Sequence, residues 1–101
     1  MGYRYNGEWK KDMPNGRGVE SWKTGARYEG ELLNGLKHGT GKYTQPDGST
    51  YQGKFSNNMF SSQGTYMWAD GKSYEGDWVE GKMNGYGVFK WPDGNRYEGR
   101  Y

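Results

Sequence analysis

The sequence predicts an all-β fold of tandem β-hairpins, with about nine strands and no helix. A Tyr-x-Gly segment returns every 23 residues, beginning at Tyr5, Tyr28, Tyr51, Tyr74 and Tyr97. A fixed period of this length is the signature of a repeat architecture. Apolar or small residues alternate with polar ones through each copy, as expected for a strand with one solvated face. Turn sequences follow at regular intervals and set the bounds of the strands.

The composition indicates a folded chain whose core is aromatic. Only 31% of the 101 residues are hydrophobic and the mean hydropathy is −1.29, which is polar for a globular core. Five Trp, ten Tyr and three Phe nevertheless provide large buriable area, which disordered segments lack. The net charge of +2 is spread along the chain, so nucleic acid is not an expected partner. The absence of cysteine favours an intracellular, cytoplasmic protein.

Each repeat is predicted to contribute two strands joined to the next repeat by a three-residue loop. The loop reads Pro-Asp-Gly at residues 46–48 and 92–94, and it fits a type I turn closed by a glycine bulge because Pro cannot adopt positive φ. Such a loop pairs Phe89 with Tyr97 and gathers the aromatic residues on one face. The predicted first strands are 4–10, 27–33, 50–56, 73–79 and 96–101, and the second strands are 18–22, 41–45, 64–68 and 87–91.

The connection within each hairpin, residues 80–85 in the fourth repeat, is predicted to be a six-residue loop, since an even length keeps the aromatic residues together. This register pairs Trp78 with Gly87, Gly76 with Phe89 and Tyr74 with Trp91. An aromatic ring then covers each strand glycine. Structural roles, with tyrosine rings over glycines, are expected for Tyr28, Tyr51, Tyr74, Tyr97, Gly30, Gly53, Gly76 and Gly99.

The repeat resembles the MORN repeat family in its Tyr-Glu-Gly-x-Trp segment at 74–78, its Asn-Gly pair at 84–85 and Trp-Pro-Asp-Gly at 91–94. The resemblance implies an elongated, twisted single-layer antiparallel sheet of stacked hairpins. It also implies scaffolding, dimerisation or partner binding, beside the cytoskeleton or a membrane surface. Because the chain starts and stops inside the repeat, we expect a piece of a longer protein. One array over 1–101 is expected, with repeats at about 5–27, 28–50, 51–73 and 74–96 and a partial copy at 97–101.

No residue pattern indicates catalysis, a cofactor or a metal. The glycine-rich segment 35–42 fails the Walker pattern because Leu36 and Tyr43 stand at its fixed positions. His38, the only histidine, is expected in a polar loop, and without cysteine a zinc site lacks ligands. Acid pairs such as Glu75 and Asp77 lie on the solvated face, where no cleft is expected to desolvate them. We therefore expect a non-enzymatic protein.

The shared aromatic face is the predicted partner-binding site. A single sheet has no second layer to cover this face, and an exposed aromatic strip is typical of a protein-binding groove. The expected occupant is an amphipathic helix or a second copy of the chain, because the open strand edges also favour self-association. Packing among the rings themselves is the competing interpretation. The predicted contacts are Trp9, Leu32, Tyr43, Phe55, Phe60, Tyr66, Trp68, Trp78, Phe89 and Trp91.

A peripheral membrane module is the alternative function. Met59 and Phe60 place apolar side chains in the atypical third loop, where they would contact lipid unless Phe60 folds back onto the sheet. Basic loop residues would contact anionic phospholipid headgroups, although acidic residues are interspersed among them. These basic residues are Lys10, Lys11, Arg17, Lys37 and Lys82.

Overall fold

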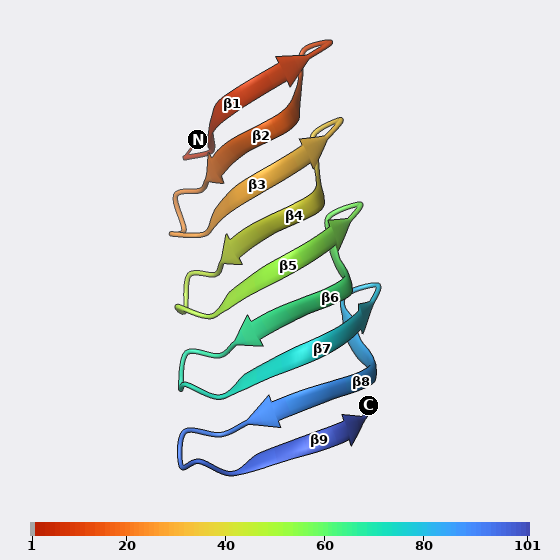
Figure 1. Cartoon of the computed structure of the whole chain (residues 1–101). Helices are drawn as coiled ribbons and strands as arrows, with labels where there is room; N and C mark the ends of the chain where they lie inside the picture. The colour runs from red at the N-terminus through yellow and green to blue at the C-terminus, as the bar shows by residue number, and fades with distance from the viewer. Residues whose placement is uncertain (1) are drawn as a thin grey trace.

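The computed structural model describes residues 2–101 and consists of one antiparallel sheet in which every strand pairs with its neighbours in sequence (Figure 1). The sheet is elongated, with extents of 46 × 25 × 15 Å, and no helix occurs among the described residues. This confirms the predicted fold class. The strands are β1 (Arg4–Lys10), β2 (Met13–Ser21), β3 (Arg27–Leu33), β4 (Leu36–Thr44), β5 (Thr50–Ser56), β6 (Met59–Met67), β7 (Ser73–Val79), β8 (Lys82–Lys90) and β9 (Arg96–Arg100).

The three-residue loops between repeats have the predicted geometry. In the last one, the Gly94 N–H donates to the Trp91 carbonyl at 3.0 Å and the Trp91 N–H donates to the Asn95 carbonyl at 2.9 Å. Gly94 has φ +95°, the left-handed conformation that a glycine bulge requires. Phe89 consequently pairs with Tyr97 across β8 and β9. The register prediction for these loops is confirmed.

The connection within each hairpin is shorter than predicted. Glu80 and Gly81, with φ of 49° and 82°, form a two-residue turn, and β8 begins at Lys82. Two adjacent residues with positive φ match the twist of a hairpin, so the strands pair up to the turn itself. The second strand of each hairpin therefore starts five residues earlier than predicted, at 13, 36, 59 and 82.

A bulge in each hairpin absorbs the residues that were assigned to the longer loop. In the fourth repeat the register shifts between Gly76 and Trp78, so that Gly76 pairs with Gly87 and Trp78 pairs with Met83. The predicted pairs of Trp78 with Gly87, of Gly76 with Phe89 and of Tyr74 with Trp91 are therefore wrong, and Tyr74 pairs with Phe89 instead. The shift is an even number of residues, which is why the aromatic residues still share one face.

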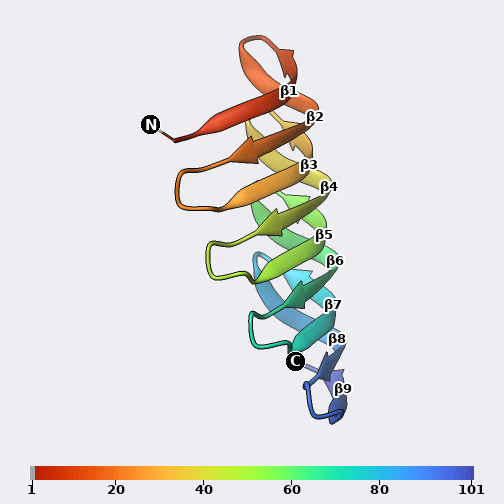
Figure 2. The ribbon, with the colours of Figure 1, turned by 90° about the vertical axis from the view of Figure 1, so that its left-hand side faces the viewer.

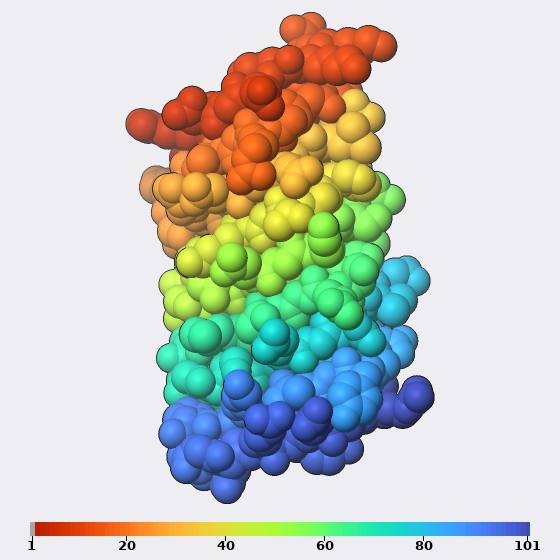
Figure 3. Space-filling view, viewed as in Figure 1, coloured from red at the N-terminus to blue at the C-terminus, as the bar shows by residue number. Residues whose placement is uncertain are grey.

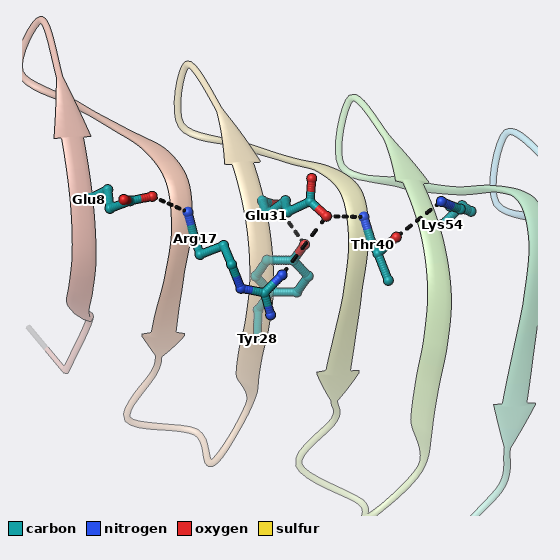
Figure 4. A network of polar contacts seen from close by, with 6 residues as sticks. All are labelled: Glu8, Arg17, Tyr28, Glu31, Thr40 and Lys54. Atoms are coloured by element: carbon teal, nitrogen blue, oxygen red, sulfur yellow. Dashed lines mark hydrogen bonds and ion pairs between the residues drawn. The ribbon is translucent and has the colours of Figure 1, made fainter.

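In the first, second and fourth repeats a carboxylate on the opposite face accepts a backbone N–H from the bulge. The Arg17 N–H donates to Oε1 of Glu8 at 2.7 Å and the Thr40 N–H donates to Oε2 of Glu31 at 3.3 Å (Figure 4). The third repeat has Lys54 at this position, and its Nζ donates to the Thr40 hydroxyl at 3.1 Å. Backbone N–H groups of a folded chain need a hydrogen-bond acceptor. These acids supply one where the sheet does not, so they have a structural role.

The sheet is bent across its strands, with both ends of each strand turned to the same side (Figure 2). The bend is sharp in β6, where the ring centroids of Phe60 and Tyr66 are 5.9 Å apart. Six residues of straight strand would span about 20 Å. The aromatic residues therefore line the concave face. We call the half of each hairpin next to the two-residue turn the tip arm, and the half next to the three-residue loop the loop arm.

Tyrosine rings fill the concave side of the bend. The rings of Tyr28, Tyr51 and Tyr74 are fully buried, and each hydroxyl donates to a carbonyl three residues later, at 2.6, 2.8 and 3.2 Å. The ring of Tyr74 covers the paired Gly76 and Gly87, where added Cβ atoms would lie 2.7 and 2.3 Å from its hydroxyl oxygen. A ring thus covers the strand glycines, as predicted, but both Gly76 in β7 and Gly87 in β8 are covered by Tyr74 of β7, and Gly76 is not covered by Phe89.

Neighbouring repeats share their core. The Phe55 ring lies 5.0 Å from Tyr51 of its own repeat and 5.2 Å from Tyr28 of the preceding one, and Trp78 contacts Tyr74 and Tyr51 at 5.3 and 5.4 Å. Successive repeats accordingly form bands that cross the molecule and lie against one another along its long axis (Figure 3). A repeat buries its tyrosine only when the next repeat is present, which is the behaviour expected of a tandem array.

Candidate functional site: the concave aromatic face

Three of the predicted partner contacts belong to the core. Leu32, Phe55 and Trp78 lie on the tip arms and are 3–5% exposed. The indole N–H of Trp78 also donates to the Gly64 carbonyl at 3.0 Å. A partner lying on the concave face would reach little of these side chains, because the bend folds the tip arms over them.

The first repeat lacks this cover. Trp9 occupies the position of Leu32, Phe55 and Trp78, but among residues 2–101 its ring pairs with one other aromatic ring, that of Tyr5 at 4.9 Å, and it is 60% exposed. At the other end Tyr97, the counterpart of the buried tyrosines, is 50% exposed and contacts Tyr101 at 5.7 Å. Each end of the array therefore presents one half of the ring pair that neighbouring repeats form elsewhere.

Five of the remaining predicted contacts form a half-open strip of touching rings. Tyr66 lies 4.6 Å from Trp68, Trp68 lies 5.3 Å from Phe89, and Phe89 lies 4.5 Å from Trp91. Trp91 is 40% exposed and the other rings are partly buried. Phe60 joins the strip from the tip arm, stacked on Tyr51 at 3.9 Å, so its ring folds back onto the sheet. Apolar surface on the loop arms thus remains accessible over the third and fourth repeats.

A polar cluster interrupts the strip in the second repeat. Gln45 stands where the other repeats have Trp22, Trp68 and Trp91, and its Oε1 accepts hydrogen bonds from the Tyr66 hydroxyl at 2.9 Å and the Ser49 hydroxyl at 2.6 Å. Ser49 is 1% exposed. Tyr43, another predicted contact, lies beyond this cluster and packs against Trp22 at 6.3 Å. The face therefore consists of two aromatic segments with hydrogen-bonding groups between them.

A buried ion pair on this face was not predicted from the sequence. Glu20, 5% exposed, lies 3.9 Å from Nζ of Lys37, whose side chain crosses from the tip arm toward the loop arm. Lys37 was predicted to be a basic loop residue. An alignment of the repeats could have identified Glu20, because Tyr43, Tyr66 and Phe89 occupy its position in the other repeats. A charge at a position that is otherwise aromatic indicates an altered local environment.

Burial on the concave face shifts the ionisation of its polar groups. Burial raises the pKa of the Tyr51 hydroxyl to about 12, and it raises the pKa of Tyr28 as well, where the nearby Glu31 carboxylate adds to the effect. The pKa of Lys37 is lowered by burial, an effect that the attraction of Glu20 opposes. The tyrosines of the core are therefore neutral at physiological pH.

The hairpin turns carry a second row of exposed apolar side chains. These residues alternate with the concave-face positions and therefore point to the opposite face. Met13, Leu33, Met59 and Val79 are 42–48% exposed. Lysines and acidic residues lie beside them in the turns. Such a row is the surface that a membrane-binding role would use.

The remaining candidate groups are the histidine and the acidic residues. His38 lies exposed in strand β4, where the sequence had suggested a loop. Among residues 2–101 no three His, Cys, Asp or Glu side chains are grouped closely enough to hold a metal ion. The same residues contain no helix long and apolar enough to cross a bilayer.

The fold and the shared aromatic core define a tandem β-repeat protein. The sequence model of the MORN repeat matches residues 5–27, 28–50, 51–73 and 74–96. The chain therefore belongs to the MORN repeat family. A comparison of the chain with curated proteins finds no match. Membership supports a repeat-based interaction or membrane-associated module and does not name a partner.

Proposed function

We propose that the protein is a non-catalytic interaction module that binds a segment of a partner protein along its concave face. The observation that carries this proposal is the half-open strip formed by Trp68, Phe89 and Trp91. Aromatic side chains of this kind are enriched among the residues that dominate binding energy at interfaces. Their partial exposure on a curved surface leaves area for a partner to cover.

An amphipathic helix along the long axis of the sheet matches the repeat spacing. Two strands advance the array by about 9.6 Å per repeat. An α-helix rises about 1.5 Å per residue, so six to seven residues span roughly one repeat. A helix with apolar residues about every seventh position would therefore place one side chain at each repeat. Such anchors would meet Trp68 and Trp91 in successive repeats.

Paired variants test this proposal. Partners captured from a lysate by the intact chain should bind the Trp68→Ala, Trp91→Ala double variant at least about tenfold more weakly, as loss of interface hot spots implies. Met67→Ala is the matched control, because Met67 is 49% exposed and points to the opposite face. Circular dichroism verifies that both variants remain folded.

A footprint then decides which surface is covered. Hydrogen exchange with a purified partner should protect β6 to β9 on the loop arms. Protection confined to the hairpin turns, or equal binding by the double variant and Met67→Ala, would contradict the proposal. Trp78 is unsuitable for this test because it is 5% exposed and its loss would disturb the core.

A second copy of the chain is another occupant that the open ends support. Exposed Trp9 and exposed Tyr97 are the two halves of the contact that Trp78 and Tyr51 make inside the array. Pairing of β9 with β1 of another copy would bring them together. Sedimentation velocity should then show association that Trp9→Ala weakens. A monomer at every accessible concentration would exclude this mode.

The exposed apolar row on the hairpin turns favours a membrane surface as the second candidate function. Met59 and Val79, with Lys82 beside them, would contact anionic phospholipid headgroups and the acyl boundary. Co-sedimentation with phosphatidylserine vesicles should fall as salt rises, since the attraction is screened. Absence of binding at low salt would remove this candidate.

A further inference from the structure

The ammonium group of Lys37 lies in a cage of three aromatic rings. Its Nζ is 5.1 Å from the ring centroid of Trp22, 5.2 Å from Tyr43 and 5.5 Å from Tyr28. All three distances are within the range at which a cation is attracted to an aromatic face. Trp22 directly follows β2 and Tyr43 lies on the loop arm of β4, and Lys37 reaches them from the tip arm across the concave face.

A buried carboxylate completes the cage. Oε1 of Glu20 lies 3.9 Å from Nζ of Lys37, and the exposed fractions of the two side chains are 6% and 17%. The other Glu20 oxygen accepts a hydrogen bond from the Tyr3 hydroxyl at 2.6 Å, which fixes the carboxylate. Buried carboxylates are costly unless they are paired, so the site requires a cation. The site is specific to this repeat, because Phe60 and Met83 stand at the position of Lys37 elsewhere.

A primary ammonium is an imperfect occupant of this cage. It has three N–H donors, and its nearest carboxylate oxygen is 3.9 Å away, beyond hydrogen-bond range, so these donors must be satisfied by solvent that reaches the 17% exposed side chain. A quaternary ammonium has no donor to satisfy and keeps both the attraction of the ring faces and that of Glu20. Aromatic cages bind methylated lysine and choline for this reason. Since a lysine stem already occupies the cage, a lysine side chain has a suitable shape.

We propose that Trp22, Tyr28, Tyr43 and Glu20 form a recognition site for a trimethylated lysine of a partner protein, which displaces the side chain of Lys37. The site lies between the two arms of the bent sheet, where a protruding side chain can enter but a flat bilayer surface cannot. The inference rests on the proposed partner-binding role of the concave face and adds a specific chemistry to it. Lys37 then acts as an internal competitor that holds the cage closed in the free protein.

Titration of the whole chain with a short trimethyllysine peptide tests the site. The indole N–H resonance of Trp22 should shift and saturate, and the unmethylated peptide should bind at least about fivefold more weakly. Lys37→Ala should bind the trimethyllysine peptide more tightly because the competitor is gone. Glu20→Gln should bind it more weakly because the carboxylate charge is lost. Lys37→Met, which introduces the residue found at position 83, removes the ammonium charge but keeps the side-chain volume, and it should also bind the trimethyllysine peptide more tightly than the intact chain.

Lys72 supplies the matched control. Its Nζ lies over one ring only, 5.7 Å from Trp68, and pairs with Asp70 at 3.4 Å. Lys72→Ala should leave peptide affinity unchanged. A peptide in which a neutral tert-butyl group replaces the trimethylammonium should bind at least about fivefold more weakly, since cation–π attraction requires the charge.

Several results would overturn the proposal. The proposal fails if the trimethyllysine peptide causes no saturable shift in the intact chain, or if it binds Lys37→Ala alone. It also fails if the neutral peptide binds as tightly as the trimethyllysine peptide, or if phosphatidylcholine vesicles cause an equal shift. The last result would assign the cage to a lipid headgroup. Failure of the cage is distinguishable from failure of the proposed function, because partner capture that depends on Trp68 and Trp91 would persist without it.

Discussion

Replacing Gly76 with alanine should destabilise the fold because the backbone of the paired strand packs directly against this glycine. A Cβ at Gly76 would lie 2.5 Å from Cα of Gly87, 2.6 Å from the Tyr86 carbonyl oxygen and 2.7 Å from the Tyr74 hydroxyl. Carbon atoms in contact are normally about 3.5–4.0 Å apart, so the neighbours would have to move by about 1 Å. The paired strand cannot move this far without losing hydrogen bonds, and the buried Tyr74 ring has no free space.

The expected cost follows from these contacts. Overpacking of this kind destabilises by about 3 kcal/mol, and the lower entropy of the unfolded alanine chain returns about 0.5–1 kcal/mol. The net loss of about 2–2.5 kcal/mol should lower the Tm by roughly 8–20 °C in a chain of this size. Thermal unfolding followed by circular dichroism measures the shift.

Gly99→Ala is the control at the same repeat position. The three atoms nearest to its Cβ would all belong to the ring of Tyr97, with the hydroxyl oxygen at 2.6 Å, and that ring is 50% exposed and able to swing away. Its Tm should stay within about 4 °C of the unsubstituted chain. Equal losses in the two variants would refute the reasoning, because the cost would then come from the repeat position and not from the packed backbone.

Four further variants test other parts of the fold. Glu31→Gln should cost about 1 kcal/mol in chemical denaturation, because the Thr40 N–H loses a charged acceptor; an unchanged midpoint would contradict the assigned role. Trp78→Ala should cost about 3–5 kcal/mol and Trp9→Ala under about 1 kcal/mol, since the two side chains are 5% and 60% exposed; similar values would contradict a shared core. Tyr51 has a folded-state pKa raised to about 12, so the stabilisation from its neutral buried hydroxyl is complete below its unfolded pKa of about 10. Up to about 3 kcal/mol of this stabilisation is lost as the pH rises from about 10 to about 12. The free energy of unfolding of Tyr51→Phe should therefore fall less steeply at alkaline pH.

The strands and their faces could be predicted because alternation and turn chemistry are local. Proline in the three-residue loop excluded the competing turn type, and the register of Phe89 with Tyr97 followed. The two-residue turn was missed although Asn34 and Gly35 form a dipeptide typical of a type I′ turn. The loop was interpreted from the fourth repeat, where Glu80 adopts positive φ, which is uncommon outside glycine and asparagine. The sequence pattern also contains no direct signal for a bulge opposite Asp77, whose position depends on pairing between strands.

Burial on the aromatic face could be predicted only in part. Alternation shows that Phe55 and Trp78 share a face with Tyr43, but it does not show that the strands bend and bring the arms together. The bend separates these residues into a buried group and a half-open group. The Glu20–Lys37 pair escaped prediction for a similar reason, because the two residues are 17 positions apart and meet across the concave face.

The insertion of each ring between tyrosines of two repeats fixes the distance from one repeat to the next. Phe55 and Trp78 set this spacing from inside the array, and the two strands of a repeat advance it by about 10 Å. The length of the molecule is therefore set by its number of 23-residue repeats. Inserting one whole repeat would move a group attached at the far end by about 10 Å, whereas removing half a repeat would leave a tyrosine without its covering ring.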